Sequence, residues 1–184
     1  FFYIDGVNTV ISMATSFGTT LGLNTTGMIL AIMVIQLIAF PCTFIFVRLA
    51  NRKGTLWVLL LAIVEYSFIC LLAFVMGWGI EFNTLSVEQG LMIFWLLAIM
   101  VGTCQGGIQA LSRSFFGKLV PQEKANEYFG FFDIFGKFAA IMGPAIYGLT
   151  KSLTGYSSYA ILAIASLFIL GGGIMWFGRR TIED

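Results

Sequence analysis

The chain has 184 residues, of which 59% are hydrophobic, 16% aromatic and only 10% charged, and its formal net charge is +1. A water-soluble domain carries about 25% charged residues because its surface must stay wetted, so this composition excludes an ordinary soluble domain. The absence of histidine excludes imidazole metal sites and Ser-His-Asp triads, and the wide separation of the three cysteines gives no metal-ligand spacing. We therefore expect no enzyme, no cofactor and no metal. The small net charge indicates no nucleic-acid partner.

Six apolar runs separated by polar breaks predict an all-α membrane protein with six transmembrane helices. A spanning helix takes about 20 apolar residues, and continuous rather than alternating apolar runs disfavour a β-barrel. We expect one domain over 1–184, with spans at about 1–20, 27–49, 55–78, 90–116, 125–150 and 157–177. No methionine or basic stretch precedes Phe1, so we expect no signal peptide and a chain that is part of a longer protein.

Basic residues mark alternate breaks between the spans. Eight of them lie at the second break, at the fourth break and after the last span: Arg48, Arg52, Lys53, Arg113, Lys118, Lys124, Arg179 and Arg180. The other breaks hold Lys151 alone. Cytoplasmic loops carry an excess of Lys and Arg, so the loops at about 49–54 and 117–124 and the C-terminus are predicted to be cytoplasmic.

The first span carries a polar stripe along one helix face. Its members recur at intervals of three and four residues: Asp5, Asn8, Thr9, Ser12, Ser16 and Thr19. Hydrogen bonding between helices is one explanation for such residues. A stripe that runs the whole span and begins with a carboxylate favours the wall of a polar cavity, and we assign Asp5, Asn8 and Ser12 to that wall.

The third and fourth spans carry further polar residues. Glu65 lies near the middle of the third span, where a proton-carrying role and a structural, hydrogen-bonded role both stay open. In the fourth span, one ridge at spacing four consists of Gln105, Gln109 and Arg113. The glutamines offer donors and acceptors to a polar solute, and Arg113 can anchor the cytoplasmic end. A neighbouring ridge of small residues, which close helix packing explains, consists of Ala98, Gly102, Gly106 and Ala110.

The fifth span contains two opposite charges and a proline. Asp133 and Lys137 lie four residues apart with the acid first, which is the favourable order for an intrahelical ion pair. A structural pair is one interpretation. Exchange of Lys137 between Asp133 and an anionic group of a solute is the other. The Gly143-Pro144 step predicts a kink, and hence a hinge, midway along the span.

The link after the second span resembles a motif of the major facilitator superfamily, G-x-L-A-D-R-x-G. Residues 47–54 read VRLANRKG, with matches at Leu49, Ala50, Arg52 and Gly54. Asn51 replaces the Asp and Val47 replaces the first Gly, a degeneration typical of the second half of such transporters. The resemblance implies helices seven to twelve, and a gating loop formed by Arg48, Asn51, Arg52 and Arg113.

Two longer segments are similar to the bacterial branch of the vacuole-effluxer-like (autophagy-related) permeases of that superfamily. They are FFYIDGVNTVISMA at the start of the chain and GGIQALSRSFFGKLVPQEKANEYFGFFDIFGKFAAIMGP at residues 106–144. The matched positions are Asp5, Gly6, Gln109, Arg113, Asp133, Lys137, Gly143 and Pro144. In such a fold the first, second, fourth and fifth helices of a half line the cavity. The polar stripes and the resemblance together therefore predict a solute site formed by Asp5, Asn8, Ser12, Gln105, Gln109, Asp133 and Lys137, and the resemblance itself marks Asp5, Gln109, Asp133 and Lys137.

The same resemblance implies secondary active transport in the bacterial plasma membrane. We expect export of a small polar solute, amino acids among the candidates, by alternating access between two six-helix halves. The expected partners are membrane lipid, the solute and the N-terminal half, or a second copy of the chain for an isolated half. Two alternatives stay open: efflux of amphipathic or lipid-like compounds, which the 19 phenylalanines favour, and a non-transporting membrane scaffold or sensor.

Overall fold

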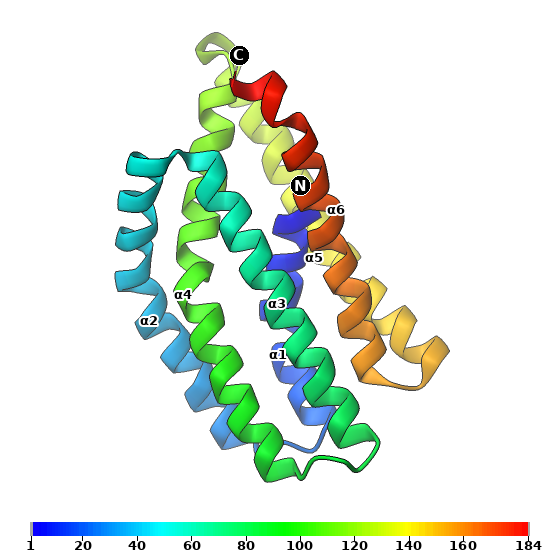
Figure 1. The fold of residues 1–184 in the computed structure, drawn as a ribbon. Helices are drawn as coiled ribbons and strands as arrows, with labels where there is room; N and C mark the ends of the chain where they lie inside the picture. Colours follow the sequence, from blue (N-terminus) through cyan, green and yellow to red (C-terminus); the bar gives the residue numbers. More distant parts are fainter. Residues whose placement is uncertain (1, 184) are drawn as a thin grey trace.

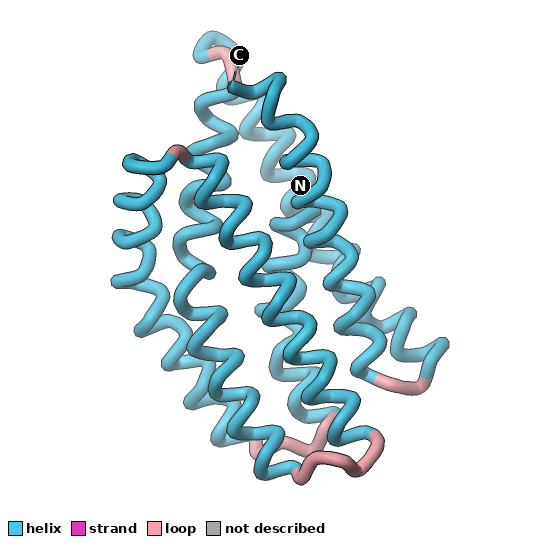
Figure 2. The backbone as a smooth tube through the Cα atoms, viewed as in Figure 1, coloured by secondary structure: helices cyan, strands magenta, loops and turns pink. Residues whose placement is uncertain are grey.

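The computed structural model describes residues 2–183, with the backbone alone for Gln122, Phe135, Ala139 and 179–183. Within this range the chain forms six long helices and one short 3₁₀ helix, without strands (Figures 1 and 2). They are α1 (Phe2–Thr20), α2 (Thr25–Lys53), α3 (Thr55–Glu81), α4 (Val87–Leu119), η1 (Gln122–Lys124), α5 (Ala125–Thr154) and α6 (Ser157–Glu183). The predicted six-helix, all-α fold is confirmed. Phe1 and the side chains of Arg179 and Arg180, which entered the sequence predictions, lie outside the described part.

The helices extend beyond the apolar runs that indicated them. For example, α2 has 29 residues, which corresponds to a length of about 43 Å against a hydrocarbon core about 30 Å thick. Local signals then set the helix ends. Asn24 caps α2 by accepting a hydrogen bond from the Gly27 N–H at 3.2 Å, Ser86 and Gln89 form a capping box at α4, and Gly155 ends α5 with a φ of 78°.

Five of the described helices, α2 to α6, are long and apolar enough to cross a membrane. The chain is therefore an integral membrane protein. The remaining helix, α1, does not reach that hydropathy, because Asp5, Asn8 and a series of Ser and Thr residues interrupt its apolar sequence. Its polar residues must be covered by protein or water rather than by lipid.

The helices pack as two groups of three, α2 with α3 and α4, and α1 with α5 and α6, and the contact between α3 and α6 joins the two groups. Helix α2 packs along α4, and α1 packs along α5. Helix α3 contacts both α4 and α6, while α6 contacts α1 and α5 (Figure 1). Exchanging α1, α2 and α3 for α4, α5 and α6 turns the α2–α4 contact into α5–α1, the α3–α4 contact into α6–α1 and the α5–α6 contact into α2–α3, and it leaves the α3–α6 contact unchanged. This is the pattern of an inverted repeat of three helices.

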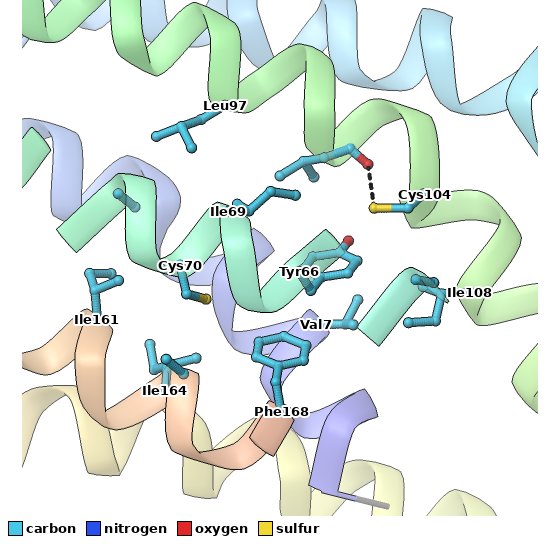
Figure 3. Close-up of a cluster of buried hydrophobic side chains, with 14 of the residues drawn as sticks. Val7, Tyr66, Ile69, Cys70, Leu97, Cys104, Ile108, Ile161, Ile164 and Phe168 are labelled. Carbon is cyan, nitrogen blue, oxygen red and sulfur yellow. Dashed lines mark hydrogen bonds between the residues drawn. The ribbon is translucent and has the colours of Figure 1, made fainter. Parts of the chain in front are cut away.

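The core lies where α1, α3, α4 and α6 meet. Tyr66 and Phe168 are fully buried, and their rings stack with centroids 5.3 Å apart at an interplanar angle of 9°. Figure 3 shows Val7 and Ile108 next to these rings. Lipid is as apolar as these side chains, so van der Waals packing rather than escape from water holds this core together.

Two helix crossings depend on glycines. On α4, a Cβ at Gly102 would lie 3.2 Å from the Ile35 carbonyl oxygen of α2, and a Cβ at Gly106 would overlap the Thr43 hydroxyl. This accounts for the small-residue ridge of α4 as a packing surface. At the crossing of α1 and α5 the threonine lies on the first helix and the glycine on the second: a Cβ at Gly143 of α5 would overlap the Thr9 hydroxyl of α1. Helix α5 continues through Pro144, and the predicted hinge there stays a prediction.

Candidate functional site

A cavity of about 90 Å³ lies between α1, α2 and α4, with α3 and α6 contributing to its floor. Its wall on α1 is apolar and includes Val10, Ala14 and Phe17. The polar side chains that line it are two amides, Gln36 of α2 and Gln105 of α4. The arrangement suits a small apolar group that carries a hydrogen-bonding function at one edge.

The amide oxygen of Gln105 is the strongest polar feature of this cavity. It is buried and has no hydrogen-bond partner among the described residues. Leaving a buried acceptor unpaired costs about 1–3 kcal/mol, and a donor group of a bound solute would recover that energy. Gln109 is one turn further along α4, exposed and outside the cavity lining. Of the two glutamines assigned to the solute, Gln105 therefore lies at the cavity.

The polar stripe of α1 does not face this cavity. Asp5 and Thr9 are buried, Asn8 is half-buried, and the later members Ser12, Ser16 and Thr19 are exposed. Several hydroxyls of the stripe bond within the helix. Thr9 Oγ1 donates to the Asp5 carbonyl at 2.7 Å, and Ser12 Oγ donates to the Thr9 carbonyl at 3.3 Å. The stripe therefore divides into a buried part near α5 and an exposed part.

Asp5 is the most buried carboxyl group of the described chain. Its side chain has no solvent exposure. The contact to Thr9 Oγ1 is a long one, 3.5 Å from Oδ1, and Oδ2 has no partner among the described residues. A buried, incompletely bonded carboxyl within a membrane helix is a candidate functional group.

Asp133 pairs with Arg113 of α4 and not with Lys137, the partner that one of the two interpretations of the sequence assigned to it. The Arg113 Nη2 to Asp133 Oδ1 distance is 3.1 Å, and the two side chains are 63% and 57% exposed. Lys137 is exposed, and the described residues offer it no ion pair or hydrogen bond. The long guanidinium side chain reaches across from α4, whereas spacing within α5 identifies only partners on the same helix.

A second cavity, of about 570 Å³, lies near this ion pair between α1, α4 and α5. Its lining is mostly aromatic: Tyr3, Phe115, Phe116, Tyr128, Phe131 and Phe132 contribute rings. The Phe116 ring also contacts Phe129 and Phe132, with centroid distances of 5.5 and 4.7 Å. Aromatic contacts and an ion pair therefore join α4 to α5 at this end of the bundle.

The exposure of the Arg113–Asp133 pair sets the expected effect of removing it. Solvent-exposed ion pairs contribute about 0–1 kcal/mol, so in the isolated six-helix chain, where no second half covers the pair, Asp133→Asn should lower the free energy of unfolding by less than about 1 kcal/mol. Chemical denaturation of the purified protein in mixed micelles measures this change. A loss well above that limit would contradict the exposed position of the pair.

Glu65 has a partner that the sequence did not indicate. Thr103 Oγ1 of α4 lies 2.7 Å from Glu65 Oε1 and donates to it. Both residues belong to the contact between α3 and α4, and neither lines the two cavities described above. This position favours the structural role over contact with a solute.

The motif after the second span lies at the end of α2. Arg48, Asn51 and Arg52 are exposed in its last turns. Within the described part of the chain, none of these three side chains forms a hydrogen bond or an ion pair with Arg113. Gly54 follows the helix with a φ of 93°, a conformation that favours glycine. The sharp turn between α2 and α3 thus explains the last glycine of the motif.

Glu81 is a structurally important residue that sequence reasoning missed. Its carboxylate, at the end of α3, accepts hydrogen bonds from the Ser157 N–H at 2.6 Å, from the Ser158 N–H at 3.3 Å and from the Ser158 hydroxyl. It therefore caps the N-terminus of α6 from another helix. The two adjacent serines at the start of the sixth span were the available signal for a helix start, but nothing in the sequence linked them to Glu81.

Comparisons with known proteins cover nearly the whole chain. The family model "Vacuole effluxer Atg22 like" matches residues 1–180. The uncharacterized MFS-type transporter YxiO of Bacillus subtilis is 45% identical over 177 residues, which cover 96% of this chain and 39% of that protein. Autophagy-related protein 22 of Saccharomyces cerevisiae is 36% identical over 111 residues, which cover 58% of this chain and 21% of that protein.

The autophagy-related protein 22 of Vanderwaltozyma polyspora is 28% identical over 174 residues, covering 92% of this chain and 33% of that protein. The chain thus spans about two fifths or less of the length of these relatives. No solved structure matches it.

Proposed function

Because the chain belongs to the Atg22-like vacuole effluxer family, we propose that it forms helices seven to twelve of a major facilitator transporter that exports a small polar solute. The family is named as a vacuole effluxer family and the Bacillus subtilis relative as an MFS-type transporter, and amino acids are the first solutes to test. The observation that carries the proposal is the cavity between α1, α2 and α4, whose lining includes Gln105, a residue with a buried amide oxygen that has no partner among the described residues. That oxygen would accept a hydrogen bond from an ammonium or amide group of the solute.

A second candidate function is efflux of amphipathic compounds. It is favoured by the apolar lining of the cavity, where isoleucine, valine and phenylalanine side chains surround the two glutamines. A solute with a large apolar part would fill this lining, and its polar group would face Gln105.

The transport mechanism requires a second wall for the cavity. Asp133, Lys137 and Gln109 are exposed on this chain, although charges inside a membrane normally face protein or a water-filled passage. An N-terminal six-helix half that covers these residues would supply the missing wall and alternate access by rocking against this one. A second copy of the chain would be the partner of an isolated half. The basic loops at about 49–54 and 117–124 would face the cytoplasm of a bacterial cell.

Flux through membrane vesicles tests the proposed function. Vesicles that contain the full-length protein would be assayed with a pool of labelled amino acids and, in parallel, with a lipophilic dye. Protein-dependent amino-acid flux supports the first candidate, and dye flux alone supports the second. Flux of neither would contradict both candidates for these solutes.

Gln105→Leu tests the cavity itself. The leucine removes the unpaired acceptor at nearly constant volume, so we expect flux to fall about tenfold, the equivalent of one hydrogen bond of about 1.4 kcal/mol, while the protein remains folded. The matched control is Asn126→Leu, which replaces an exposed amide in the first turn of α5, outside both cavities. Equal flux in the two variants would show that Gln105 does not contact the transported solute.

A further inference from the structure

A groove of about 440 Å³ runs between α3 and α6, on the side of the bundle away from the solute cavity. One side is formed by α3, from Trp57 to Val64, and the other by α6 at Gly172, Gly173 and Trp176. Trp57, Leu61 and Val64 are 53% to 68% exposed. In a membrane-spanning chain, this apolar groove opens towards lipid.

Two of the glycines beside the groove differ in what packing requires. Gly171 must be small, because a Cβ there would lie 2.8 Å from the Tyr3 backbone nitrogen of α1. Gly173 has no such need, since nothing lies within 4 Å of a Cβ at that position. A glycine inside a helix costs about 0.5–1 kcal/mol relative to alanine. Because Gly173 has no side chain, the groove stays open at this position, where a larger residue would fill it.

One end of the groove has the features of a lipid headgroup region. Trp57 lies in the first turn of α3, and Trp176 lies across the groove on α6. Tryptophan favours the level of the headgroups. The exposed cations Arg52 and Lys53 end α2, one residue before α3 begins. Basic groups beside a pocket between membrane helices are complementary to anionic lipid headgroups.

We propose that the α3–α6 groove binds one anionic glycerophospholipid. An acyl chain occupies the hollow beside Gly173, and the glycerol backbone lies at the level of Trp57 and Trp176. The phosphate group faces Arg52 and Lys53. The apolar groove selects for an acyl chain, and the two cations select for negative charge.

Native mass spectrometry of the purified full-length protein in detergent tests this site. The protein would be titrated with phosphatidylglycerol and, separately, with phosphatidylcholine carrying the same acyl chains. We expect one phosphatidylglycerol molecule to be retained in preference to phosphatidylcholine. Gly173→Leu fills the hollow and should weaken its binding by about tenfold or more. Size-exclusion chromatography establishes that each variant is folded and monodisperse.

Two further variants separate the acyl site from the charge site. Gly148→Leu is the matched control, because a Cβ at Gly148 of α5 also meets open space but lies outside the groove; it should bind lipid as the unmodified protein does. Arg52→Gln with Lys53→Gln should reduce the preference for phosphatidylglycerol and leave acyl binding intact. Equal retention by the Gly173→Leu and Gly148→Leu variants, or equal retention of the two lipids by the unmodified protein, would overturn the proposal.

Discussion

Replacing Gly143 with alanine is expected to lower the free energy of unfolding by about 3 kcal/mol, at the upper end of the usual cost of overpacking. The new Cβ would overlap the Thr9 hydroxyl and lie 2.7 Å from the Thr9 Cβ. Thr9 is buried and β-branched, so its side chain cannot rotate freely away. Helices α1 and α5 would have to separate at their crossing. Chemical denaturation in mixed micelles measures the loss.

A matched substitution on the same helix isolates this contact. Gly148→Ala places the same methyl group in open space, and it should raise stability by up to about 1 kcal/mol through helix propensity. Adding Thr9→Gly to the Gly143→Ala variant should recover part of the loss, because it removes the overlapping atoms. Equal stability of the Gly143→Ala and Gly148→Ala variants would show that the crossing is not close-packed.

Glu81→Ala is expected to cost about 2–3 kcal/mol, because it removes a charged acceptor and leaves buried donors unpaired. The carboxylate binds the first N–H groups of α6, and Ser157 and Ser158 are themselves buried. The partial positive charge of the helix N-terminus adds to this interaction. Glu81→Gln should lose less, because its amide oxygen can still accept a hydrogen bond. The same denaturation experiment measures both variants.

Glu88 provides the control for the loss of a carboxylate. It is exposed in the first turn of α4, so Glu88→Ala should lose only its interaction with the helix N-terminus, about 0.3–1 kcal/mol. If Glu81→Ala costs no more than Glu88→Ala, the connection between α3 and α6 contributes nothing beyond surface electrostatics.

The fold could be predicted because the signals for membrane helices are local. Apolar runs identify the segments that cross the hydrocarbon layer, and turn residues such as Gly54 and Gly155 lie between them. The helix ends were less predictable. The length of an apolar run reflects only the part of a helix that lies in the hydrocarbon layer. Helix α2 extends beyond that part, through the polar residues Asn51 and Arg52 to Lys53. Helix α1 was expected to span like the others, but its polar stripe lowers its hydropathy below that of α2 to α6.

The candidate site was less predictable, because its contacts join residues far apart in the sequence. Spacing four within α5 suggested a pair between Asp133 and Lys137, whereas Asp133 contacts Arg113, 20 residues away on another helix. Glu65 and Thr103 are separated by 38 residues. Periodicity identifies which residues share a helix face, but it does not identify which neighbour that face meets. The sequence assigned Gln105 and Gln109 alike to the solute, and only the packing shows that Gln105 lines the cavity whereas Gln109 does not.

The contact pattern of α1 has a consequence for biosynthesis. Helices α2, α3 and α4 can pack together as soon as α4 has been made, but α1 makes few contacts with α2 or α4 and packs mainly against α5 and α6. Among these six helices, α1 is made first, but the bundle therefore encloses it only after α5 and α6 have been made. Completion of α6 is then the event that allows α1 to take its place in the bundle.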